Sequence, residues 1–175
     1  PHLTKPLLTY WIMAANFHLW GPTEWAARLH SALAALAVLL LTADLARRWM
    51  GPQAAGEVIL MLATSPLFFA LARLADPNML MTCCIILAFW AWVTWQQTGS
   101  RWRLAVFYLG LGLAFFTKGP VAVLLVVFGL ASFRKWGGSA FLARRTWSWL
   151  GFTAAALIGL WWFIWMIDRQ PELFR

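Results

Sequence analysis

The sequence predicts an all-α polytopic membrane protein with about six transmembrane helices and one helix that lies in the membrane interface. Of its 175 residues, 62% are hydrophobic and only 11% are charged, and the mean hydropathy is +0.70. An average soluble domain is about half apolar and about a quarter charged. A chain of this length has too little interior to hide so much apolar side chain from water. These figures exclude a soluble single-domain enzyme and favour lipid as the solvent.

The first predicted element is a short interfacial helix over residues 6–20. Pro6 suits the first turn of a helix, and the stretch is shorter than the ~20 residues that cross a bilayer. It carries Tyr10 and two tryptophans, Trp11 and Trp20, and such side chains are typical of headgroup depth. Residues 21–24 contain Gly and Pro and separate this helix from the next one, for which Thr23 is the expected cap.

Six apolar stretches follow, and each approaches or reaches the length of a membrane span. We predict spans at residues 26–45, 55–74, 79–95, 104–116, 121–133 and 147–167. The fourth and fifth are short, and Gly119-Pro120 between them is typical of a turn between antiparallel spans. The alternative, one long kinked span, would place Lys118 in lipid at a cost of ~3 kcal/mol or more. Residues 137–145 then form a cytoplasmic linker.

Basic residues predict the orientation of the chain. Fourteen Lys and Arg against six Asp and Glu give a net charge of +8, which in a soluble protein would suggest a nucleic-acid partner. Here one side of the membrane receives basic residues in pairs, namely Arg47, Arg48, Arg101, Arg103, Arg134, Lys135, Arg144 and Arg145. The positive-inside rule places that side in the cytoplasm. We therefore expect no nucleic-acid partner, and Lys5, Asp76 and Lys118 lie on the outer face.

Two outer lysines are candidates for binding a phosphate group. Lys5 precedes the start of a helix, where free N–H groups and the positive end of the dipole favour anions, and Tyr10 adds a hydroxyl donor. Lys118 lies in the turn between two short spans, within reach of a lipid phosphate. The alternative for both lysines is an interfacial anchor without a ligand.

The outer loop from Arg73 to Asn78 holds the third candidate, Asp76. An aspartate before Pro77 matches a helix cap followed by the first helical residue, and Arg73 is close enough in sequence to pair with it. The functional alternative makes Asp76 an outward-facing carboxylate that binds a sugar hydroxyl, a metal or another catalytic group.

The other charged residues are expected to be structural. Glu24 and Arg28 have the i, i+4 spacing of an ion pair at the entry of the first full span, and Asp44 lies one turn before Arg47 and Arg48. The sequence contains no Gly-rich phosphate loop, Ser-His-Asp set or Cys/His metal spacing. Its three histidines are too scattered to predict a metal site.

Four phrases, in this order and spacing, resemble those of a known family. They are Lys5-Pro6-Leu7-Leu8-Thr9-Tyr10-Trp11, Glu24-Trp25-Ala26-Ala27-Arg28-Leu29, Ala63-Thr64-Ser65-Pro66 through Asp76-Pro77-Asn78, and Gly112-Leu113-Ala114-Phe115-Phe116-Thr117-Lys118-Gly119-Pro120. The set resembles the bacterial polyprenyl-phosphate-sugar glycosyltransferases with the GT-C membrane fold (family 39). That family is similar to protein O-mannosyltransferases and includes the lipid A aminoarabinose transferases. The resemblance runs over nearly the whole chain.

The resemblance implies an inverting glycosyltransferase of the bacterial inner membrane, with its active face on the periplasmic side. The donor would be a polyprenyl-phosphate-linked sugar, and the acceptor would be a lipid, glycan or protein of the cell envelope. The resemblance leaves open whether the enzyme uses a divalent metal. Lys5 matches a family position that contacts the lipid-linked phosphate, Lys118 matches the Thr-Lys-Gly turn of the family, and Asp76 matches a second acidic position in the next outer loop. We expect Lys5 and Lys118 to offset charge on the leaving phosphate and Asp76 to support catalysis. The main catalytic acid of the family would precede Pro1, so we expect these residues alone to be inactive.

Two departures from the family pattern leave alternatives open. Some members carry the loop acid two residues later, which makes Asn78 the alternative to Asp76, with Arg73 as a further candidate in the same loop. The chain also has His30 where the family often has proline. The rival hypothesis is a transporter or flippase fragment for a lipid-linked substrate. Such a protein would place ionisable residues in broken helices at mid-membrane depth, whereas here they cluster near span ends.

Overall fold

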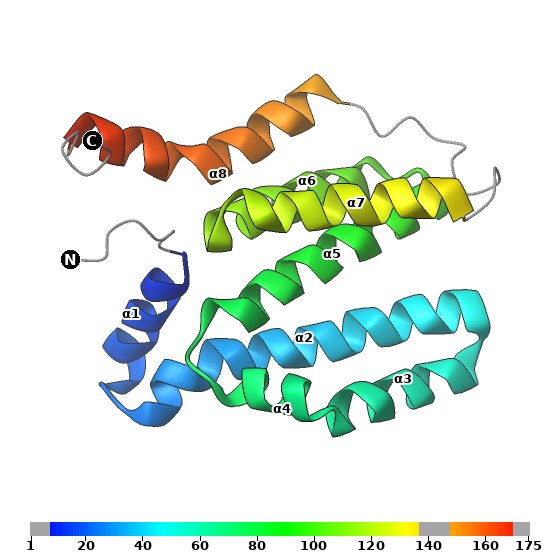
Figure 1. Cartoon of the computed structure of the whole chain (residues 1–175), viewed down its shortest axis with the longest axis horizontal. Coiled ribbons are helices and arrows are strands. Elements are labelled where there is room, and N and C mark those ends of the chain that lie inside the picture. Colours follow the sequence, from blue (N-terminus) through cyan, green and yellow to red (C-terminus); the bar gives the residue numbers. More distant parts are fainter. Residues whose placement is uncertain (1–7, 137–147, 170–175) are drawn as a thin grey trace.

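The chain folds as a bundle of α-helices (Figure 1). The computed structural model describes residues 8–136 and 148–169, and every regular element within these ranges is a helix. The helices are α1 (Leu8–Trp20), α2 (Glu24–Met50), α3 (Pro52–Thr64), α4 (Pro66–Arg73), α5 (Pro77–Thr98), α6 (Arg101–Lys118), α7 (Pro120–Trp136) and α8 (Trp149–Arg169). The predicted linker over residues 137–145 lies outside the described residues.

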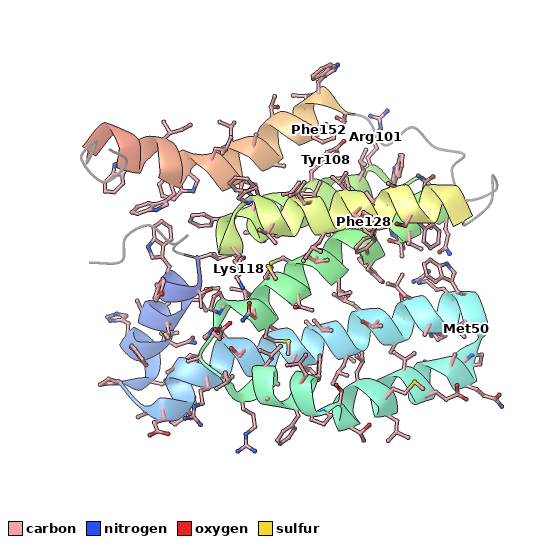
Figure 2. The ribbon with its side chains drawn as sticks, in the orientation of Figure 1. Met50, Arg101, Tyr108, Lys118, Phe128 and Phe152 are labelled. Carbon is pink, nitrogen blue, oxygen red and sulfur yellow. The ribbon has the colours of Figure 1, made fainter. Side chains whose placement is uncertain are left out.

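The helices run back and forth, so that the bundle has two distinct ends (Figure 1). The turn between α6 and α7 and the start of α5 lie at one end, which we call the Lys118 end. The turns that follow α2 and α5 lie at the other end, which we call the Arg47 end. Figure 2 shows Lys118 at the first end and Met50 and Arg101 towards the second. The bundle therefore places Arg101 and the last turn of α2, which carries Arg47 and Arg48, away from Lys118, as the sequence pattern predicts.

Two of the described helices, α2 and α5, are long and apolar enough to cross a membrane. Helices α3 and α4 pass the same test as a pair but are bent by 69°, and shorter apolar segments lie in α7 (Pro120–Phe133) and α8 (Trp149–Trp162). The stretch predicted as one span over residues 55–74 is thus two helices. The break occurs because Ser65 is extended and Pro66 begins α4 in the first helical turn, where its missing N–H costs no hydrogen bond.

Local sequence signals set the other helix boundaries. The Thr23 side chain accepts a hydrogen bond from the Ala26 N–H at 3.4 Å, which confirms the predicted cap of α2. Helix α6 ends at Lys118, and Gly119 has a φ of +80°, a conformation that glycine adopts without steric cost. Helix α7 begins at Pro120 and runs antiparallel to α6 (Figure 1). The predicted turn is present, and a single kinked helix is not.

The most extensive contact between helices joins α5 to α6. Ala88 is fully buried, and a Cβ added to Gly110 would lie 3.1 Å from the Ala88 backbone nitrogen. The surrounding core holds large apolar and aromatic side chains of both helices, such as Trp92 and Phe107. Large apolar side chains also face outward, as Phe128 on α7 does at 74% exposure. An apolar exterior of this kind suits contact with lipid.

Side-chain bonds connect α2 to α5 near the Arg47 end. Asp44 accepts hydrogen bonds from Arg47 at 2.7 Å and from Arg48 at 2.5 Å, so the charges expected to pair along α2 do so. The same carboxylate also accepts the indole N–H of Trp90 on α5 at 2.8 Å. This carboxylate therefore fixes the position of one apolar helix against another.

Candidate functional site

The structure brings together Lys118 and Asn78, which lie forty residues apart in the sequence. Lys118 is exposed at the end of α6, and its ammonium group donates a hydrogen bond to Oδ1 of Asn78 in the first turn of α5. The acceptor is a neutral amide, and no carboxylate pairs with Lys118 within the described ranges. The bond therefore positions the ammonium without cancelling its charge, and leaves that charge available to an anion.

Asp76 holds the start of the helix that carries Asn78. Its backbone is extended, and its Oδ1 accepts the Asn78 N–H at 2.7 Å, with Pro77 as the first helical residue. The predicted cap is therefore confirmed. Because the carboxylate orders the turn in which Asn78 lies, Asp76, Asn78 and Lys118 form one connected group, which we call the Lys118 site.

His30 lies in α2 close to this group, and sequence analysis noted it only as a departure from the family pattern. It is only 4% exposed, and its Nε2 lies 3.2 Å from the Ser31 hydroxyl. The Asp76 carboxylate is near enough to act on the ring electrostatically. A histidine inside an otherwise apolar stretch was the available signal, because a buried polar side chain usually has a specific neighbour.

Arg73 does not join the Lys118 site. Its guanidinium lies over the Phe69 ring, 5.2 Å from the ring centroid, and it lines a groove with Glu24 and Arg28. The pairing with Asp76 suggested by their spacing is absent. Helix α4 ends at Arg73, and Leu74 is extended, so the two residues do not share a continuous helical face.

Helix α1 lies across the Lys118 end of the bundle instead of along it (Figure 1). Asn16 holds it to α2 through a hydrogen bond from Nδ2 to the Ala26 carbonyl oxygen at 3.1 Å. Trp11 packs edge-on against Phe116 of α6 at a centroid distance of 5.8 Å, two residues before Lys118. Tyr10 is half exposed on this helix. Lys5 lies outside the described residues.

Metal ligands are not gathered anywhere in residues 8–136 and 148–169. No group of three or more His, Cys, Asp or Glu side chains lies close enough there to hold an ion. The Lys118 site itself consists of a cation, an amide and a carboxylate.

Fold and site together define a helical membrane protein with a lysine-centred polar site at one end of its bundle. The family described as dolichyl-phosphate-mannose-protein mannosyltransferase matches residues 4–165. The chain belongs to this family, and the family resemblance found in the sequence is confirmed.

Comparison with individual proteins agrees with this family. The chain is 28% identical to the undecaprenyl phosphate-alpha-4-amino-4-deoxy-L-arabinose arabinosyl transferase of Edwardsiella ictaluri, over 99% of this chain and 32% of that protein. It is 32% identical to an uncharacterized protein of Aquifex aeolicus, over 70% of this chain and 25% of that protein. The crystal structure of ArnT from Cupriavidus metallidurans bound to undecaprenyl phosphate is similar at a TM-score of 0.82 and 28% identity, over 97% of this chain and 32% of that one. The chain thus has a GT-C-like fold and spans about a quarter to a third of the length of these relatives.

Proposed function

We propose that this chain is part of an integral-membrane glycosyltransferase. It would transfer a sugar from a polyprenyl-phosphate donor to a lipid, glycan or protein acceptor on the outer, periplasmic side of a bacterial inner membrane. Family membership and the likeness to a structure that holds undecaprenyl phosphate support this class and this donor. The observation that carries the proposal is the Lys118 ammonium, which a neutral amide positions at the end of the bundle.

The reaction explains why an unneutralised cation is useful at this position. An acceptor oxygen attacks the anomeric carbon of the sugar, and the bond from that carbon to the phosphate oxygen breaks. The bonding electrons leave with the polyprenyl phosphate, and the acceptor proton passes to a base. Negative charge grows on the leaving phosphate oxygen, and a cation already in place there stabilises the transition state. We assign this role to Lys118, with Lys5 as a second cation and Tyr10 as a hydroxyl donor to the same phosphate.

Asp76 has a supporting role in this proposal. Its Oδ1 caps α5 and so fixes the turn that holds Asn78 against Lys118. Its carboxylate is also the candidate for orienting the sugar or the base, with Asn78 as the alternative at this position. The base itself would be the main acid of the family, which the resemblance places before Pro1.

The test is release of polyprenyl phosphate by the full-length protein in proteoliposomes, with an undecaprenyl-phosphate-linked sugar as the donor. We would compare the wild type with Lys5→Ala, Asp76→Asn and Lys118→Ala at equal protein levels. Arg101→Gln is the matched control, because it removes an exposed cation towards the opposite end of the bundle. Loss of one preorganised donor to a developing charge typically costs about 100-fold or more in rate. Lys118→Ala should therefore release polyprenyl phosphate about 100-fold more slowly, and Arg101→Gln should not.

Two results would contradict the proposal in different ways. Unchanged release in all three site variants would reduce these residues to interfacial anchors. Movement of the donor across the membrane without release, even in the wild type, would favour a transporter or flippase for a lipid-linked substrate.

A further inference from the structure

A groove of about 440 Å³ lies between α2 and α4, separate from the Lys118 site. Its lining residues are Glu24, Trp25, Arg28, Leu29, Ala32, Ala72 and Arg73. The two helices contact each other, and the small side chains of Ala32 and Ala72 leave the hollow between them. A volume of this size falls within the range of about 300–1,000 Å³ that is usual for ligand sites.

Two arginines line this groove. Arg28 is bonded to Glu24 at 3.3 Å, whereas Arg73 lies over the Phe69 ring and has no carboxylate partner in the described part of the chain. Two arginines against one glutamate leave the groove with a net charge of +1. A guanidinium presents a planar set of N–H donors that matches a phosphate group, which binds in a bidentate manner.

The surroundings of the groove indicate a ligand that comes from the membrane. On α4, Leu67 and Phe69 are 69% and 54% exposed, so the flank beside the groove is apolar and suits lipid. On α2, Trp25 is half exposed and its ring lies 5.8 Å from that of Trp20. Tryptophans of this kind lie at headgroup depth. The groove therefore lies where an apolar flank meets a polar end of the bundle.

We propose that this groove binds one anionic glycerophospholipid of the surrounding membrane. Its phosphate lies between Arg28 and Arg73, and one acyl chain follows the apolar strip of Leu29, Ala32 and Ala72. A soluble phosphate compound has no acyl chain to pack against that strip, and a zwitterionic lipid would gain less binding energy from the net positive charge. The assignment is independent of the proposed transferase activity, because the Lys118 site uses other residues on other helices.

The test is lipid retention by the purified full-length protein, measured by native mass spectrometry in detergent. Equal amounts of phosphatidylglycerol and phosphatidylcholine are added to each sample. Each arginine near an anionic lipid surface contributes a favourable energy of about 1 kcal/mol, which corresponds to about 5-fold in affinity. The Arg28→Gln, Arg73→Gln double variant should therefore retain phosphatidylglycerol about 30-fold less than the wild type. The control Arg101→Gln removes an exposed arginine outside the groove and should retain it fully.

A second variant separates the groove from general attraction between charges. Ala32→Phe fills the groove and leaves both arginines in place, so it should also lose the bound phosphatidylglycerol. Equal thermal unfolding midpoints would show that the variants are folded.

Several outcomes would overturn the proposal. These are equal retention of the two lipids by the wild type, full retention by the double variant, or an equal loss in Arg101→Gln. If the double variant keeps phosphatidylglycerol but loses added undecaprenyl phosphate, the arginines belong to the donor site and the proposal is also wrong.

Discussion

Asp44 connects α2 to α5, and its replacement tests the packing near the Arg47 end. The carboxylate accepts three hydrogen bonds, from Trp90 at 2.8 Å, from Arg47 at 2.7 Å and from Arg48 at 2.5 Å. Its side chain is only 20% exposed. Arg48 in turn donates to Gln97 of α5 at 3.4 Å, so loss of the carboxylate affects two links between the helices.

We expect Asp44→Ala to lower the free energy of unfolding by about 2–4 kcal/mol. A hydrogen bond to a charged acceptor, such as that from Trp90, is worth ~1.5–3 kcal/mol. Ion pairs along a helix, such as those with Arg47 and Arg48, are worth ~0.3–0.5 kcal/mol each. Asp44→Asn should cost about 1 kcal/mol, because the amide oxygen still accepts the indole N–H while the charge is lost.

The assay is denaturant unfolding of the full-length protein in detergent, followed by circular dichroism. Trp90→Phe serves as the matched partner variant, because it keeps an aromatic ring but removes the N–H. We expect the order of stability to be wild type, then Asp44→Asn, then Asp44→Ala, with Trp90→Phe also destabilised. Equal losses for Asp44→Asn and Asp44→Ala, or a Trp90→Phe variant as stable as the wild type, would refute the reasoning.

Three further predictions follow from the packing, the helix cap and the two ends of the bundle. Gly110→Leu should destabilise the protein by about 1–3 kcal/mol in the same unfolding assay, because the new side chain would meet the α5 backbone. The control Gly56→Leu should not destabilise the protein, because there is open space around Gly56. Asp76→Ala should lose about 1 kcal/mol of stability with its cap, but Asp76→Asn should keep the cap and so report any catalytic use of the carboxylate through activity alone. In a cysteine-free background, Lys118→Cys should react with a membrane-impermeant thiol reagent added outside cells and Arg47→Cys should not; the reverse pattern would invert the proposed orientation.

Features that depend on a few neighbouring residues could be predicted from the sequence. The caps at Thr23 and Asp76 follow from a polar side chain just before a helix, and the structure confirms both. The Glu24–Arg28 pair follows from i, i+4 spacing and is present at 3.3 Å. Each of these features is decided within about one helical turn, so tertiary packing does not have to be known.

Features that depend on how helices pack were not predictable in the same way. Trp90 reaches Asp44 across 46 residues of sequence, and Lys118 reaches Asn78 across 40. The groove between Arg28 and Arg73 exists only once α4 lies against α2. The break at Pro66 did have a local signal, but the apolar run on both sides of it favoured one continuous span.

Binding of undecaprenyl phosphate tests most directly the claim that Lys118 offers an unneutralised charge to a lipid phosphate. The dissociation constant would be measured for the full-length wild type, Lys118→Met, which keeps the length of the side chain, and Lys118→Arg, which keeps the charge. Since a hydrogen bond to a charged group is worth ~1.5–3 kcal/mol, we predict that Lys118→Met binds about 10-fold more weakly or worse and that Lys118→Arg recovers part of the loss. An affinity of Lys118→Met equal to that of the wild type would contradict the account.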